Sequence, residues 1–146
     1  MPDDVVFMRT PAVWAKPMKA HAKLYFVADA LGVPNEIHMD LFRLLTKEQR
    51  LVNEKQFAEV FARYGVDQAT FDDVYNSFGI KGKLKSAETR LRKNYQTRGT
   101  PEVIVNGKYR VRAKREAPQV SQPMIMDIVD FLIEKERSAM QSAEAS

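Results

Sequence analysis

The segment 98–112 constrains the fold of this chain more than any other part of the sequence. Thr100-Pro101 comes directly before a run of strand-forming residues, 102–105, and Asn106-Gly107 separates that run from a second one, 109–112. An Asn-Gly pair between two such runs is typical of a type I′ turn, because both central residues of that turn need a positive φ. The sequence therefore predicts an antiparallel hairpin that follows an X-Pro turn.

The Thr100-Pro101 bond has two open interpretations. An X-Pro bond adopts the cis form at a cost of only about 0.5–1 kcal/mol, and Gly99 permits unusual backbone angles just before it. A cis bond would turn the backbone of Thr100 outward, leaving its N–H and C=O free to bind an extended peptide like an added strand. A trans proline at the first residue of a strand fits the spacing equally well. Thr100 and Pro101 are the candidate substrate-binding residues.

The rest of the chain is predicted to form an early strand, a block of helices and a closing helix. Val5–Met8 is short, β-branched and apolar, which predicts a buried strand. Apolar residues at helical spacing predict helices over 16–31, 35–45, 53–64, 67–78, 83–97 and from 124 onward, with fraying after 138. Asn53 and Asp67 are predicted N-caps, and Gly32, Gly65 and Gly79 are predicted helix ends. This order predicts one mostly helical α/β domain, in which four or five helices interrupt a small sheet.

The absence of cysteine limits the chemistry of the chain. With no Cys among 146 residues, disulfides, Cys-ligated zinc and thiol catalysis by this chain alone are excluded. His21 and His38 lie on different predicted segments without carboxylates at ligand spacing, so no metal site and no cofactor are expected. The Asp72-Asp73 pair and Asp127 with Asp130 are interpreted as solvated helix-face carboxylates, and no catalytic residue is assigned.

Charge is distributed unevenly along the chain. The net charge is +4, but residues 81–115 contain twelve Lys or Arg against two Glu, so this stretch is +10 and the remainder is −6. Such a stretch is able to attract nucleic acid or acidic surfaces. It is also typical of a solvated helix face and hairpin, and nucleic acid is the less favoured partner. The apolar runs fall short of the roughly 20 residues that span a bilayer.

Several separate segments resemble one known family. The sequence from Gly99-Thr100-Pro101 through Asn106-Gly107-Lys108-Tyr109 resembles the cis-proline loop and hairpin of the DsbA type of thiol:disulfide interchange protein. Val13-Trp14, the run from Lys19 to Gly32, and Asp72–Phe78 resemble helices of that family's helical insertion. The match extends from about Val5 to Leu132.

The resemblance implies an incomplete thioredoxin-like fold and a periplasmic setting. It assigns residues 17–97 to the helical insertion, and 1–12 with 98–140 to the thioredoxin-like remnant, within a single domain, 1–146. The implied activity is the introduction of disulfides into exported proteins. That chemistry needs a Cys-x-x-Cys pair at a helix N-terminus, where the helix dipole lowers the thiol pKa. In the family this pair precedes the strand matched by Val5–Met8, and only Thr100 and Pro101 carry over from the active site.

The sequence therefore suggests a DsbA-like chain truncated at its N-terminus and inactive by itself. The acidic start, Met1-Pro2-Asp3-Asp4, lacks the features of a signal peptide. Expected partners are extended or unfolded peptides and, from the resemblance, a redox membrane protein. Loss of the central strand exposes sheet edges, so a homodimer or an exchanged strand is also expected. The alternative is a cysteine-free module that binds peptides, in a chaperone-like way, without redox chemistry.

Overall fold

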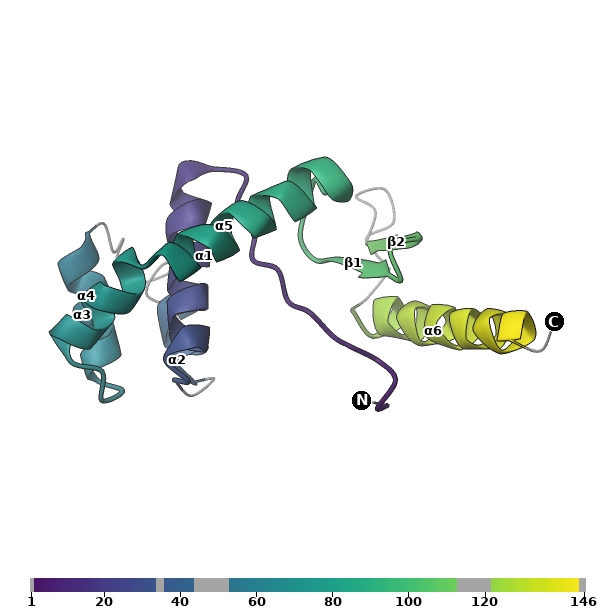
Figure 1. The fold of residues 1–146 in the computed structure, drawn as a ribbon, viewed down its shortest axis with the longest axis horizontal. Coiled ribbons are helices and arrows are strands. Elements are labelled where there is room, and N and C mark those ends of the chain that lie inside the picture. Colours follow the sequence, from purple (N-terminus) through teal and green to yellow (C-terminus); the bar gives the residue numbers. More distant parts are fainter. Residues whose placement is uncertain (1, 34–35, 44–52, 113–121, 145–146) are drawn as a thin grey trace. The chain divides into compact units, whose positions relative to one another are not determined.

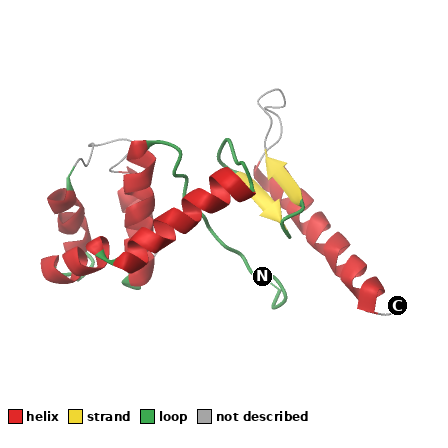
Figure 2. Ribbon diagram, turned by 45° about the horizontal axis from the view of Figure 1, so that its top comes forward, coloured by secondary structure: helices red, strands yellow, loops and turns green. Residues whose placement is uncertain are grey.

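The computed structural model describes residues 2–33, 36–43, 53–112 and 122–144 (Figure 1). The chain divides into two compact units, Met1–Leu91 and Arg92–Ser146. The first unit is helical and the second consists of a hairpin and a long helix (Figure 2). Along the described residues, no helix combines the length and the apolar character that a membrane span requires.

Among its described residues, the first unit has five α-helices that pack around an aromatic core. Phe61 and Phe71 are fully buried with their ring centroids 5.0 Å apart, and Tyr75 stacks on Phe71 at 5.1 Å. Leu24 and Val27 of the first helix are also completely buried and complete this core. The helices are α1 (Lys16–Ala30), α2 (Glu36–Arg43), α3 (Glu54–Ala62), α4 (Gln68–Asn76) and α5 (Phe78–Thr89).

Local capping explains where most of these helices begin and end. Asn53 accepts a hydrogen bond from the N–H of Gln56 at 3.0 Å, and Asp67 accepts one from the N–H of Thr70 at 2.9 Å. Both predicted N-caps are therefore confirmed. Gly32 and Gly65 follow α1 and α3 with φ of +61° and +81°, the left-handed conformation that glycine adopts after a helix. Leu44 and Leu45, predicted to extend the second helix, lie outside the described residues.

The prediction that a helix runs to Phe78 and ends at Gly79 is wrong. The α4 helix ends at Asn76, and Ser77 begins α5 by accepting a hydrogen bond from the N–H of Ile80 at 3.2 Å. The chain turns at Ser77, because this residue has extended backbone angles. Phe78 therefore does not continue the apolar side of α4, and 90% of its surface is exposed. Gly79 thus lies inside the first turn of α5. The predicted helix over 83–97 is the end of α5 continued by a π-helical turn, Arg90–Asn94 (η2).

The predicted buried strand at Val5–Met8 is also absent. This segment has no strand partner among the described residues, and Val6 is 88% exposed while Phe7 and Met8 are 55% and 61% exposed. A β-strand exists only when a neighbouring strand takes its backbone hydrogen bonds. Within the described residues, the backbone of this segment makes one hydrogen bond, from the N–H of Val5 to the C=O of Pro2 at 3.1 Å.

The predicted hairpin forms in the second unit. Strands β1 (Glu102–Val105) and β2 (Tyr109–Arg112) pair antiparallel, with Val105 opposite Tyr109. Asn106 and Gly107 between them have φ of 47° and 69°, as a type I′ turn requires. Figure 2 shows this hairpin lying against the long helix α6 (Gln122–Glu144). That helix continues well past the position at which fraying was predicted.

Only part of the predicted apolar face of α6 is covered. Ile125 and Val129 are buried against Val105 and Val111 of the hairpin. Other apolar side chains of α6 remain largely exposed, because a two-stranded sheet covers only a narrow strip of a helix. They are Met124, Met126, Ile128, Phe131 and Met140.

Candidate functional site

The Thr100-Pro101 loop is the structural feature that corresponds to the predicted peptide contact. The bond between the two residues is cis, which selects one of the two interpretations that the sequence left open. Both residues are exposed, and they precede β1 directly. Within the described part of the chain, the backbone of Thr100 takes part in no turn or loop hydrogen bond. Among the described residues, its N–H and C=O therefore have no backbone partner in a turn or loop.

One arginine side chain connects the two ends of this loop. Arg110 Nε lies 3.2 Å from Glu102 Oε1, just after the loop, and its guanidinium also donates a hydrogen bond to the C=O of Tyr95, just before it. The Glu102 side chain is only 3% exposed, so the arginine compensates a nearly buried carboxylate. Gln96, which opens the loop, has a φ of 49°. The loop thus begins and ends at residues held by the same side chain.

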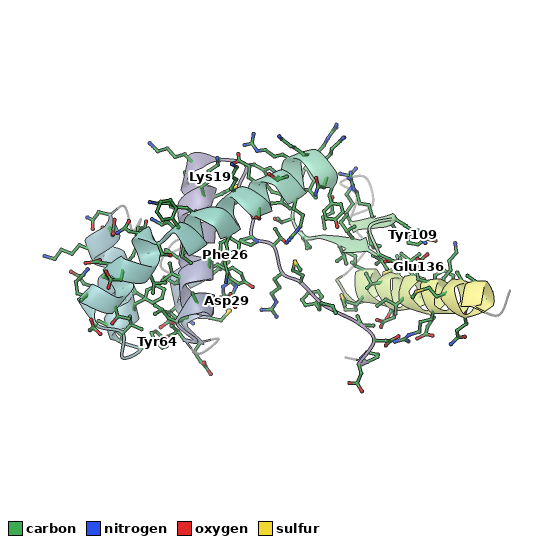
Figure 3. All side chains as sticks on the ribbon, in the orientation of Figure 1. Lys19, Phe26, Asp29, Tyr64, Tyr109 and Glu136 are labelled. Atoms are coloured by element: carbon green, nitrogen blue, oxygen red, sulfur yellow. The ribbon has the colours of Figure 1, made fainter. Side chains whose placement is uncertain are left out.

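A second polar cluster fixes the hairpin turn on α6. Glu136 Oε2 accepts hydrogen bonds from Asn106 Nδ2 at 2.5 Å and Lys108 Nζ at 2.7 Å, and Figure 3 shows Glu136 on the side of α6 that faces the hairpin. Glu136 is 7% exposed. The hydrogen bond from Lys108, followed by that from Asn106, lowers the pKa of Glu136, and the same contact raises the pKa of Lys108.

Sequence reasoning missed both clusters, for different reasons. The Asn-Gly turn fixes the register that places Glu102 opposite Arg112, and Arg110 is then the diagonal neighbour on the same face. The first cluster was therefore predictable from the hairpin. Glu136 lies 28 residues after Lys108, and no spacing in the sequence relates the two.

His21 of α1 and His38 of α2 both line one hollow in the first unit. A hollow of about 210 Å³ is lined mainly by apolar side chains together with His21 and His38. Partial burial lowers the pKa of His21, while the His38 ring makes an edge contact with Tyr25 at 6.1 Å between centroids. Among the described residues, no group of three or more His, Asp or Glu side chains is arranged to hold a metal ion.

The acidic pairs lie on exposed helix surfaces. Asp72 accepts a hydrogen bond from Gln68 Nε2 at 2.8 Å on the exposed side of α4. Asp127 and Asp130 are exposed on α6. None of these three carboxylates lines the described hollows. The candidate site is therefore the Thr100-Pro101 loop.

Comparison with known proteins identifies the family. Residues 5–123 match the model of the DSBA-like thioredoxin domain. This chain belongs to the DsbA-like thioredoxin family. It is 35% identical over 141 residues to the thiol:disulfide interchange protein DsbA of Pseudomonas aeruginosa, and 34% identical over 146 residues to that of Pseudomonas syringae pv. tomato. The alignments cover 95% and 99% of this chain.

Solved structures support the same assignment. The DsbA-like chain matches the crystal structure of Pseudomonas aeruginosa DsbA with a TM-score of 0.85 and 34% identity, covering 97% of this chain and 72% of that one. It matches the oxidoreductase DsbA from Xylella fastidiosa with a TM-score of 0.79 and 27% identity. The chain spans 64% of the length of the curated Pseudomonas aeruginosa relative and 66% of the Pseudomonas syringae one. The predicted fold class is confirmed as a mostly helical, thioredoxin-like fold with a small sheet.

Proposed function

We propose that this chain is the peptide-contacting portion of a DsbA-like thiol:disulfide oxidoreductase that introduces disulfides into exported proteins. The observation that carries the proposal is the exposed Thr100-Pro101 loop at the start of β1, within a chain of the DsbA-like family. The N–H and C=O of Thr100, which have no backbone partner in a turn or loop among the described residues, suit a main-chain contact with an extended peptide. Thr100 and Pro101 are assigned to substrate contact, and a periplasmic location with a redox membrane protein as partner belongs to the same proposal.

Disulfide exchange itself requires a group that these 146 residues do not contain. A thiolate attacks one sulfur of a disulfide, a mixed disulfide forms, and the other sulfur leaves as a thiolate. With no cysteine in the sequence, this chain provides neither the attacking nor the leaving sulfur. The proposed role of the chain is therefore to hold the peptide, while the thiol chemistry takes place on cysteines that it does not supply.

The lack of cysteine makes a direct test of peptide contact possible. A Thr100→Cys variant carries a single thiol, to which a maleimide photocrosslinker is attached. We expect it to crosslink a fluorescent, carboxymethylated unfolded peptide several-fold more efficiently than a Ser138→Cys variant, whose label lies on the exposed surface of α6 in the same unit. Equal yields from the two positions would remove the support for the proposed contact.

A redox assay tests the remainder of the proposal. The chain is incubated with a reduced dithiol peptide and glutathione disulfide, and disulfide formation is followed over time. We expect the uncatalysed rate. Acceleration by this cysteine-free chain would contradict the assignment of the thiol chemistry to other residues.

A cysteine-free peptide-binding module is the second candidate. The zero cysteine count and the exposed apolar side chains Val6, Phe7 and Phe131 favour it. This module would suppress the aggregation of an unfolded protein that contains no cysteine, whereas the oxidoreductase portion would show no such activity. Measuring aggregation of a cysteine-free unfolded substrate by light scattering distinguishes the two functions.

A further inference from the structure

Helices α1 and α5 together form a lysine-rich surface in the first unit. Lys19 and Lys23 are one turn apart on α1, and Lys81 and Lys85 are one turn apart on α5. The two helices pack against each other. We call these four residues the α1/α5 lysine surface; Figure 3 labels Lys19, which lies at its α1 edge.

A hollow brings three of these lysines together. It has a volume of about 250 Å³, with Val13 and Leu84 among its lining residues, and Lys19, Lys81, Lys85 and Glu88 complete it. Val13 is 1% exposed, so the hollow has an apolar floor beneath its charged groups. Three lysines from two helices therefore line one hollow whose lining residues include a single carboxylate, that of Glu88.

The positive charge of this surface is not balanced. Glu88 forms an ion pair with Lys19 at 2.9 Å. Lys81 and Lys85 form no ion pair with any described residue, and both side chains are exposed. Two uncompensated ammonium groups at one hollow suit an anionic partner such as a phosphate ester.

Lys23, on α1, adds a further positive charge to this surface. Its Nζ lies 3.1 Å from the centroid of the Tyr75 ring, a cation–π contact. Burial lowers the pKa of Lys23, the carboxylate of Glu54 opposes that shift, and the positive charge of Lys81 adds to it. Lys23 and Lys81 are thus close enough for their like charges to interact.

An exposed aromatic side chain adjoins the lysines. Phe78 is 90% exposed, and Lys81 Nζ lies 5.3 Å from the centroid of its ring. Residues 78, 81 and 85 lie on the same face of α5, because they are three and seven positions apart. An aromatic ring flanked by lysines is suited to the boundary between water and the apolar part of a bilayer, where the ring enters the interface and the ammonium groups meet phosphates.

We propose that the α1/α5 lysine surface, with Phe78, binds the headgroups of an anionic phospholipid bilayer. Charge complementarity supports this partner, because Lys81 and Lys85 are exposed, line one hollow and form no ion pair with a described residue. Nucleic acid is favoured less, since this surface contains no arginine for bidentate base contacts and Phe78 is its one exposed aromatic ring among the described residues. The binding is peripheral and weakens with salt.

Vesicle co-sedimentation tests the proposal with the full chain. At low salt, we expect binding to phosphatidylcholine vesicles that contain roughly 30–40% phosphatidylglycerol. We expect much weaker binding to pure phosphatidylcholine and at about 0.5 M NaCl. Removing two lysine charges in Lys81→Gln/Lys85→Gln lowers the partition coefficient about thirty-fold, since each lysine near an anionic surface contributes roughly a fivefold factor. Adding Phe78→Ser to this double variant lowers the partition coefficient further and leaves the circular dichroism spectrum unchanged.

A matched variant determines whether this surface is responsible. Lys55→Gln/Lys135→Gln removes the same charge from exposed positions on α3 and α6, and we expect it to retain most of the binding. An equal loss in the two double variants would overturn the proposal, because binding would then follow net charge alone. Tighter binding to a short DNA duplex than to anionic vesicles at the same salt would also overturn it, in favour of nucleic acid.

Discussion

At the scale of single residues, Arg110 links the two sides of the candidate peptide loop. Its guanidinium contacts Glu102 and the C=O of Tyr95, which lie on either side of Thr100-Pro101. Arg110→Gln leaves a nearly buried carboxylate without its counter-charge, which we expect to cost about 1–3 kcal/mol of the free energy of unfolding of this unit. Amide hydrogen exchange of the strand residues measures that loss.

Loop positioning needs its own measurement. A nitroxide attached to Thr100→Cys reports the mobility of the loop by electron paramagnetic resonance, and we expect sharper lines when Arg110→Gln is added. Lys135→Gln is the matched control, because it removes the same charge from an exposed position on α6 in the same unit. Identical spectra for the two double variants would show that Arg110 does not position the loop.

Ser77 determines where the chain leaves α4 and begins α5. Its hydroxyl accepts the hydrogen bond from the N–H of Ile80, and Ser77→Ala removes that acceptor from the start of α5. We expect a loss of about 1 kcal/mol in the free energy of unfolding, measured by urea titration. Ser86→Ala, at an exposed interior position of α5, should leave stability unchanged or slightly raised, because alanine favours a helix interior.

At the scale of elements, the Glu136 cluster joins α6 to the hairpin and makes that junction sensitive to pH. The pKa of Glu136 is lowered in the folded chain. The stability that Glu136 contributes is therefore present above 4.5, its pKa in the unfolded chain, and is lost as pH falls through its pKa in the folded chain. The pKa of Lys108 is raised in the folded chain. The stability that Lys108 contributes is therefore fully present below pH 10.5, and it is lost only as pH rises above that value through the folded pKa.

The expected result is a loss of hairpin protection below about pH 4.5 that depends on Glu136. Amide exchange of Val105 and Lys108, followed from pH 7 to pH 3 and corrected for intrinsic exchange, measures it. Glu136→Gln should make protection lower at pH 7 and nearly independent of pH. Glu134→Gln, on the exposed side of the same helix, is the control. A wild-type pH dependence in Glu136→Gln would show that other carboxylates are responsible.

Elements with a strong local signal were predictable from the sequence. Asn53 and Asp67 cap helices through bonds three residues away, and the Asn106-Gly107 turn sets the hairpin register by itself. Ser77 was missed because Phe78 continues an apolar periodicity that the fold interrupts. The predicted substrate residues are exposed at the loop, and the bond between them is cis, which the residue pair alone left open. Glu136 was missed because only the packing of α6 brings it to the turn.

At the scale of the whole molecule, the exposed segment Val5–Met8 and the edges of the hairpin are unpaired in the described structure. The sheet contains β1 and β2 alone, so each strand has one edge without a strand neighbour. An unpaired edge is a template for another strand, and Val6 and Phe7 present apolar surface that a sheet normally covers. These two features motivate the expectation of a homodimer or an exchanged strand.

The prediction is that the mass of the chain in solution rises with concentration toward that of a dimer. Light scattering coupled to size exclusion measures it. A Val6→Lys/Phe7→Lys variant should shift the chain toward monomer, because two charges on this segment oppose its addition to a sheet. Because both side chains are exposed, the midpoint of the unfolding transition should not change. Lys16→Glu/Lys55→Glu changes two other exposed side chains and should leave the association intact. A monomer at every concentration would show that the unpaired edges are tolerated in water, and the peptide loop would then act within a single chain.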